Sequence, residues 1–109
     1  GNRLENIEKN KISDDNVSLI EEQLLATGKV KSVSYDLKGK LINYILVVND
    51  DVDKVTSQSL TAKILEGFEQ NIKEYYDFQV FITTEQESEI YPIIGYKHFN
   101  SANFVWTNN

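Results

Sequence analysis

The side chains best suited to metal or acid–base chemistry fall in three short stretches of the chain. Asn49, Asp51 and Asp53 stand at alternate positions, which is the spacing that opens a calcium-binding loop. The sixth and twelfth positions of such a loop would be Lys54 and Leu60, where glycine and glutamate are needed. Because aspartate is favoured just before a helix, we interpret these carboxylates as helix caps and expect no metal site.

A second acidic stretch, EQESE, places Glu85, Glu87 and Glu89 at alternate positions. Paired carboxylates perform acid–base catalysis only where burial or neighbouring charges separate their pKa values. The glutamine and serine between them indicate a solvated loop, so we interpret this stretch as a solvent-facing turn.

His98 is the only side chain whose unperturbed pKa lies near neutrality, which makes it the candidate general base. No spacing links it to a serine nucleophile, and no nucleophile-elbow motif is present. The chain has no cysteine, which removes thiol nucleophiles, disulfides and cysteine-ligated zinc sites. Its five glycines are scattered and form no phosphate-binding loop. We therefore expect no catalytic residue, no cofactor and no enzymatic activity.

The closing stretch YPIIGYKHFNSANFVW holds the only proline and the only tryptophan of the chain. Aromatic walls with few polar groups are typical of small-ligand pockets. If the stretch folds over a sheet, four side chains would line such a pocket: Tyr91, Tyr96, His98 and Trp106. The same segment can instead act as a hydrophobic cover, with Phe104 and Trp106 buried against the sheet.

Composition and charge narrow the class of protein. The 109 residues, of which 40% are hydrophobic and 26% charged, suit one soluble globular domain. A net charge of −6 argues against nucleic-acid binding, which needs a basic surface. No apolar run approaches the roughly 20 residues of a membrane-spanning helix. We expect a flexible lead-in or linker remnant over residues 1–12 and a single α+β domain over 13–109.

Apolar spacing predicts the elements that would position these residues. A first helix is expected from Ser13, a good N-cap, to Gly28, which allows a left-handed stop. A second, longer helix is expected within 50–76, where apolar side chains recur at helical spacing. A hairpin over 30–49 turns at Gly39, and its return strand is apolar on both faces, as in a central strand.

Two or three further strands follow the second helix, and the predicted order is α-β-β-α-β-β. One is expected over 77–85, and one or two short strands over 90–97 and 102–107, with Pro92 at an edge or a strand start. Two amphipathic helices on one face of an antiparallel sheet would bury the apolar surface, giving a two-layer α+β sandwich with a split ferredoxin-like order.

The two-sided return strand raises the question of what covers the second face of the sheet. If Leu37 pairs with Lys40, Tyr35 meets Ile42 on the face that carries the helices. The opposite face would then show an apolar patch made of Leu41, Ile45, Val47 and Phe81. A bare patch of this kind is unusual for a monomer. We therefore expect it to be covered either by the closing stretch from Tyr91, called the aromatic tail below, or by another protein chain.

The α-β-β-α-β order over residues 13–84 resembles the ring-building motif of bacterial membrane-assembly and sporulation proteins. It is also similar to the cytoplasmic domain of cation-diffusion transporters. The first resemblance implies an extracytoplasmic domain that assembles through protein contacts. The second implies metal-binding histidines, and residues 13–84 contain none. No residue role is carried over from either family.

The sequence begins GNRLEN and contains no methionine, from which we expect a removed signal peptide or membrane anchor, or a domain cut. Abundant lysine, asparagine and isoleucine favour a bacterium with an AT-rich genome. We therefore predict a non-enzymatic, extracytoplasmic interaction or assembly domain of a membrane-anchored or secreted bacterial protein. Its partner would be another protein or a second copy of itself. The alternative is a small-ligand binder or minor enzyme with an aromatic pocket around His98.

Overall fold

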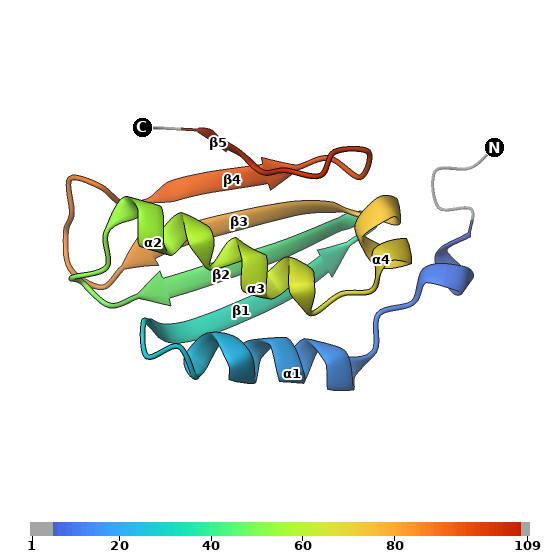
Figure 1. The fold of residues 1–109 in the computed structure, drawn as a ribbon, viewed down its shortest axis with the longest axis horizontal. Helices are drawn as coiled ribbons and strands as arrows, with labels where there is room; N and C mark the ends of the chain where they lie inside the picture. The colour runs from blue at the N-terminus through green and yellow to red at the C-terminus, as the bar shows by residue number, and fades with distance from the viewer. Residues whose placement is uncertain (1–5, 108–109) are drawn as a thin grey trace.

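A five-stranded sheet forms one layer of the molecule, and the helices lie across one of its faces (Figure 1). The computed structural model describes residues 6–107. The strands lie side by side in the order of the chain: β1 (Val30–Lys38), β2 (Leu41–Val48), β3 (Asp77–Thr84), β4 (Ile93–Lys97) and β5 (Val105–Thr107). The predicted α+β class is confirmed.

The sheet is mixed, so the prediction of an antiparallel sheet is wrong at its centre. β1 and β2 form an antiparallel hairpin, and β3, β4 and β5 form a second antiparallel set. Between them β2 and β3 run parallel, with Leu41 opposite Asp77 and Val48 opposite Thr84. The helical connection carries the chain back along the sheet, so β3 begins at the same end as β2.

The second predicted helix is broken into three short helices. The helical segments are η1 (Ile7–Asn10), α1 (Asp14–Leu25), α2 (Lys54–Ser59), α3 (Thr61–Glu66) and α4 (Gln70–Tyr75). Around the first break, the hydroxyls of Ser57, Ser59 and Thr61 each donate to a backbone carbonyl three residues earlier. Such local hydrogen bonds compete with a continuous helix. The second break follows Gly67, the residue after α3.

The predicted caps at Ser13, Gly28 and Asp53 are confirmed. Ser13 Oγ accepts a hydrogen bond of 3.1 Å from the backbone N–H of Asn16, and Gly28 has a φ of +75°. Asp53 is the N-cap of α2, and its carboxylate accepts from the N–H of Thr56 at 2.8 Å. Hydrogen bonding by Thr56 holds the pKa of Asp53 below its ordinary value. A capping role therefore accounts for the carboxylate in the calcium-like spacing that lies nearest the helix.

The core lies between the helices and one face of the sheet. Alternate strand residues point into it: Ile42, Tyr44, Leu46, Val48, Phe78, Val80, Ile82 and Ile93. The hairpin turns at Gly39, with φ of +57°, and Tyr35 pairs with Tyr44 instead of the predicted Ile42. The predicted register is thus wrong by two residues. Because side chains alternate with a period of two, this shift leaves each residue on its predicted face.

The segment before α1 contacts the rest of the domain through Asn10. The hydroxyl of Tyr76 donates to the Asn10 carbonyl at 2.7 Å, and the Asn71 amide donates to its side chain at 3.0 Å. The predicted lead-in over 1–12 therefore includes an attached 3-10 turn, while residues 1–5 lie outside the described residues. Within 6–107, no helix has the length and hydropathy that crossing a bilayer requires.

Candidate functional site

The face of the sheet opposite the helices, called the open face below, carries the predicted interaction residues. Leu41, Ile45 and Val47 alternate along β2, and Ile45 pairs with Phe81 across the parallel ladder. Ile45 is 40% exposed, and the other three are half-buried. Leu41 lies nearer the sheet end, opposite Asp77, so the continuous apolar part of the surface is Ile45, Val47 and Phe81.

The register adds residues to this surface that the sequence did not single out. Phe81 pairs with Ile94 on β4, so Ile45, Phe81 and Ile94 form one apolar row across the three central strands. The neighbouring row runs Asp36, Asn43, Gln79, Tyr96 and Val105. The alternation of β4 could have placed Ile94 on the open face, but its position beside Phe81 depends on the register between two strands.

The open face carries little charge. In the central row Ser34 lies at one end and Thr107 at the other, and every residue between them is apolar. The next row contains Ser32, Val47 and Thr83. Among the paired residues of the described strands, the charged side chains of this face are Asp36, Lys38 and Asp77, which lie at the ends of its rows. This neutral centre contrasts with the net charge of −6 on the whole chain.

The aromatic tail does not cover the open face, which corrects the prediction of a covering segment. β4 and β5 continue the sheet beside β3, as Figure 1 shows. Trp106 pairs with Gly95, whose position faces the helices, and its ring stacks on Phe104 at 5.8 Å between centroids. A Cβ on Gly95 would lie 2.8 Å from the Trp106 ring, so the glycine makes room for the indole. The tail therefore widens the sheet and leaves the open face accessible.

The four side chains of the predicted aromatic pocket do not meet. Tyr91 is buried near α2, where its hydroxyl donates to the carbonyls of Val52 at 2.6 Å and Asp53 at 3.1 Å. Tyr96 lies on the open face, with its ring 4.9 Å from that of His98. Trp106 lies on the helix side of the sheet. A pocket formed jointly by Tyr91, Tyr96, His98 and Trp106 is thus absent from the described residues.

His98 sits at the exposed end of β4. Its Nδ1 lies 3.9 Å from Asp77 Oδ1, and that same carboxylate oxygen accepts from the N–H of Phe99 at 2.9 Å. The exposed His98 side chain therefore neighbours a carboxylate that is already engaged by the backbone. Among residues 6–107, no hydrogen bond joins a serine hydroxyl to the imidazole, and Ser101 meets His98 only through a backbone hydrogen bond.

The EQESE stretch is solvent-facing, as predicted. Glu85, Glu87 and Glu89 are exposed, and Glu85 pairs with Lys31 at 2.6 Å across the surface. Within residues 6–107, no group of three or more histidine, aspartate or glutamate side chains is placed to hold a metal ion.

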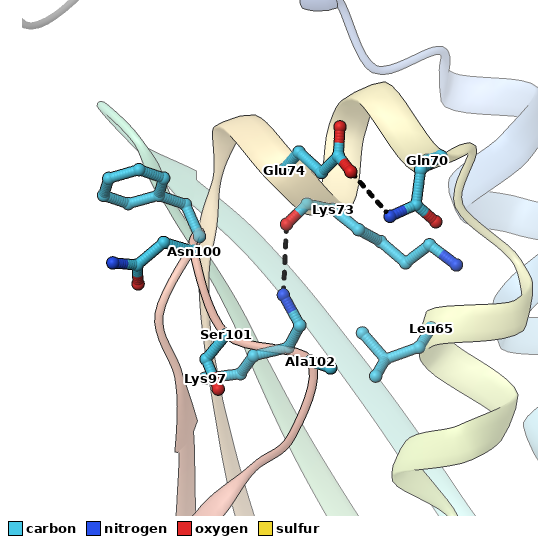
Figure 2. Close-up of a pocket in the computed structure, with 9 residues that line it drawn as sticks. Leu65, Gln70, Lys73, Glu74, Lys97, Asn100, Ser101 and Ala102 are labelled. Carbon is cyan, nitrogen blue, oxygen red and sulfur yellow. Dashed lines mark hydrogen bonds between the residues drawn. The ribbon is translucent and has the colours of Figure 1, made fainter.

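A pocket of about 560 Å³ lies between α4 and the loop after β4, away from the open face (Figure 2). Its buried polar residue is Lys97, whose side chain is on the helix side of the sheet and only 3% exposed. Lys97 Nζ donates to the carbonyls of Lys73 at 3.0 Å and His98 at 3.3 Å. Burial, reinforced by the charge of Lys73, lowers the pKa of Lys97.

Lys97 was not predicted to be a buried residue, although the sequence indicates its inward-facing position. The residues Ile93, Gly95 and Lys97 alternate along one strand, so a lysine occupies the same face as a core isoleucine. A charged residue at a core-facing position is rarely buried without partners.

Comparison of the chain with protein-family models, with curated proteins and with solved structures gave no match.

Proposed function

We propose that this domain is a non-enzymatic interaction module that associates with a second copy of itself through the open face. The observation that carries the proposal is the apolar row of Ile45, Phe81 and Ile94, which lies uncovered at the centre of the sheet. Exposed contiguous apolar surface on a small soluble domain is characteristic of interaction sites. Burying it between two copies would remove it from water without any conformational change.

The distribution of charge favours a second copy as the partner. Two chains that each carry −6 repel one another wherever their acidic surfaces meet. In a two-fold interface, each surface also meets itself, so charged groups near the axis would face their own copies. The central row of the open face avoids this repulsion. An axis along β3 would place Phe81 against its own copy and Ile45 against Ile94 of the other chain.

The size of the open face sets the expected strength of association. Five strands about 4.8 Å apart, of up to about eight residues each, give a face of roughly 20 by 25 Å, or about 500 Å². A standard-size interface buries about 800 Å² on each partner. We therefore expect a reversible dimer that forms in the micromolar to millimolar range.

Sedimentation equilibrium over micromolar to millimolar concentrations tests this proposal. The expected result is a concentration-dependent dimer for the natural chain, weakened at least about tenfold by Ile45→Asp, because two charges would face the apolar row. The matched control is Val55→Asp. Val55 is 74% exposed on α2, on the helix side, so the same substitution there should leave the dimer unchanged.

Two outcomes would contradict self-association. One is a natural chain that stays monomeric up to millimolar concentration. The other is a dimer that Ile45→Asp and Val55→Asp weaken equally, since this would place the contact elsewhere or make it a general effect of charge. A monomer that binds an unrelated protein through Ile45 would assign the open face to a different partner.

The more detailed predictions, of strand order, family resemblance, membrane anchor and location, belong with this proposal. The hairpin, the helical connection and the parallel strand after it are compatible with a split ferredoxin-like order, but the fifth strand extends beyond that order. The resemblance to the ring-building motif, the membrane anchor and the extracytoplasmic location stay predictions. Self-association through a sheet face would be consistent with an assembly role. The alternative prediction was a small-ligand pocket around His98. It loses its basis because the four predicted lining residues do not meet.

A further inference from the structure

The pocket between α4 and the loop after β4 contains a buried cation with an unfilled donor position (Figure 2). A lysine ammonium has three N–H donors. Lys97 Nζ uses two of them on the carbonyls of Lys73 and His98, and the Phe78 ring lies 5.4 Å from it. Among residues 6–107, no oxygen or nitrogen accepts the third N–H. Because Lys97 also lines the pocket, this third donor is available to an acceptor that enters there.

Lys97 has a structural role that explains part of its position. The Lys73 carbonyl belongs to α4, which ends two residues later at Tyr75, so the ammonium bonds a carbonyl in the last turn of that helix. A neutral hydrogen-bond donor would satisfy the same carbonyl. The structural role therefore does not require that a full positive charge be kept 97% buried, which costs solvation free energy.

Among the residues that line the pocket the cations outnumber the anions, while Asp77 acts on Lys97 from outside the lining. Lys73 lines the pocket as a second cation, while Glu74 is the anion in its wall. Glu74 Oε2 already accepts from the Gln70 amide at 3.0 Å, as Figure 2 shows. No ion pair between Glu74 and Lys97 occurs within the described part of the chain. An entering anion would thus meet two lysines and a carboxylate that is engaged elsewhere.

Three apolar side chains form the rest of the wall together with two neutral polar residues, Asn100 and Ser101. Leu65 lies on the α3 side, and Phe99 and Ala102 lie on the loop after β4. The combination of a buried cation with an apolar wall selects for molecules that have one anionic end and a short apolar body. A volume of about 560 Å³ is in the range of small-molecule sites.

We propose that this pocket binds a small organic carboxylate through Lys97, with its apolar body against Leu65, Phe99 and Ala102. The carboxylate would accept the third N–H of Lys97 and lie close to Lys73. The electrostatics support this assignment. Burial and the charge of Lys73 lower the pKa of Lys97, while Asp77 and Glu74 only partly oppose them. A bound carboxylate would offset the repulsion between the two lysines.

Two sources can supply this chemistry, a free acid and the C-terminal residue of a peptide. Titration of the chain with hexanoate and with N-acetyl-leucine, followed by backbone amide NMR shifts, separates them. Hexanoate represents the free acid, and N-acetyl-leucine represents a peptide terminus. N-acetyl-leucinamide is the matched neutral probe. We expect saturable shifts within residues 70–74 and 97–102 for at least one carboxylate, and at least tenfold weaker binding of the amide, on the order of one charged hydrogen bond.

Variants of the pocket test the role of Lys97. Lys97→Met should weaken carboxylate binding about tenfold or more, and a folded spectrum is the condition for interpreting it. Ala102→Trp fills the pocket from its exposed rim and leaves both lysines in the sequence, so it keeps the test valid if Lys97→Met unfolds. Its matched control is Ala62→Trp, at an exposed site on α3, which should bind normally.

The proposal is overturned if neither carboxylate gives saturable shifts, or if N-acetyl-leucinamide binds as tightly as N-acetyl-leucine. Equal binding by Ala102→Trp and Ala62→Trp would overturn it as well, because the ligand would then lie outside the pocket. The result is independent of the open face. Ile45→Asp should bind the carboxylate as the natural chain does, whether or not the domain dimerises.

Discussion

Three buried tyrosine hydroxyls meet very different surroundings. Tyr91 donates to two carbonyls next to α2, and Tyr76 donates to the carbonyl of Asn10. The hydroxyl of Tyr44 is fully buried and has no hydrogen-bond partner among the described residues, although its ring packs edge-on against Tyr35 at 5.4 Å. Burying a hydroxyl without a partner costs free energy, so the oxygen of Tyr44 opposes folding while its ring favours it.

The same substitution at two of these tyrosines should have opposite effects. Tyr91→Phe should lower the free energy of unfolding by about 1–2 kcal/mol, because two carbonyls lose their donor. Tyr44→Phe should leave it unchanged or raise it by about 1 kcal/mol, because only an unpaired hydroxyl is removed. Urea denaturation of both variants checks this. A loss of stability in Tyr44→Phe as large as that in Tyr91→Phe would show that the Tyr44 hydroxyl is hydrogen-bonded.

Single residues were predictable where their role is local. Ser13 and Asp53 cap helices through N–H groups three residues away, so the sequence around them contains the whole interaction. The partners of Lys97 include Lys73, 24 positions earlier in the chain. Only the alternation along β4 indicated that this lysine faces inward. Its pocket depends on how α4 and the loop after β4 approach one another, which no local pattern contains.

At the scale of elements, Gly67 determines how closely α3 approaches α1. A Cβ at this position would overlap Cγ1 of Ile20 and lie 2.7 Å from its Cδ1. Ile20 is fully buried on α1, so it has little room to move away. The φ of Gly67 is −78°, which any residue can adopt, so close packing is the reason that glycine is required here.

Gly67→Ala should therefore destabilise the domain although alanine favours helices. The gain in helix propensity is up to about 1 kcal/mol, and overpacking costs about 1–3 kcal/mol, so we expect a net loss of up to about 2 kcal/mol. In thermal or urea unfolding, the double variant Gly67→Ala with Ile20→Ala should be less destabilised than the sum of the single variants. Strict additivity of the two changes would mean that a Cβ at position 67 does not overlap the Ile20 side chain.

Element type was more predictable than element continuity or direction. The apolar spacing through Leu60, Ile64, Phe68 and Ile72 continues across the breaks in the second helix, because all four side chains still reach one core. The helical period therefore did not indicate the breaks. The parallel pairing of β2 with β3 follows from the length and path of the helical connection, so the alternation within each strand could not indicate it.

At the scale of the whole molecule, buried tyrosines make stability sensitive to alkaline pH. Burial is the main cause that raises the pKa of Tyr35, to about 12, and it also raises the pKa values of Tyr44, Tyr76 and Tyr91. In the unfolded chain tyrosine ionises near pH 10. The tyrosine contribution is thus complete below about pH 10 and is lost as the pH rises through the folded pKa values. Lys97, with its lowered pKa, acts in the opposite direction up to about pH 10.5.

We expect the free energy of unfolding to fall between about pH 10 and about pH 12, because four tyrosines outweigh one lysine. Urea denaturation at several pH values in this range measures the slope. Tyr35→Phe should make the slope shallower, since it removes one tyrosine whose pKa is raised in the folded state. Stability that is flat or rising across this window in the natural chain would contradict the assignment.

Predicting the open face required both local and global information. The two-sided apolar pattern of β2 correctly placed Ile45 and Val47 on one face, because alternation survives a register shift of two residues. It could not show where the tail lies. Phe104 and Trp106 suit a cover over the sheet as well as a strand beside it, and the space above Gly95 on the helix side decides between them.

The parallel pair at the centre of the sheet also bears on how the chain reaches this structure. Every β2–β3 pair joins residues 36 positions apart, as with Leu41 and Asp77, whereas the hairpin pair Lys38 and Leu41 is local. Closing the long connection costs chain entropy before the pairing can offset it. We expect the two antiparallel units to form early and the ladder that joins them to limit the folding rate. Until that ladder forms, β2 and β3 each expose an unpaired edge to other chains.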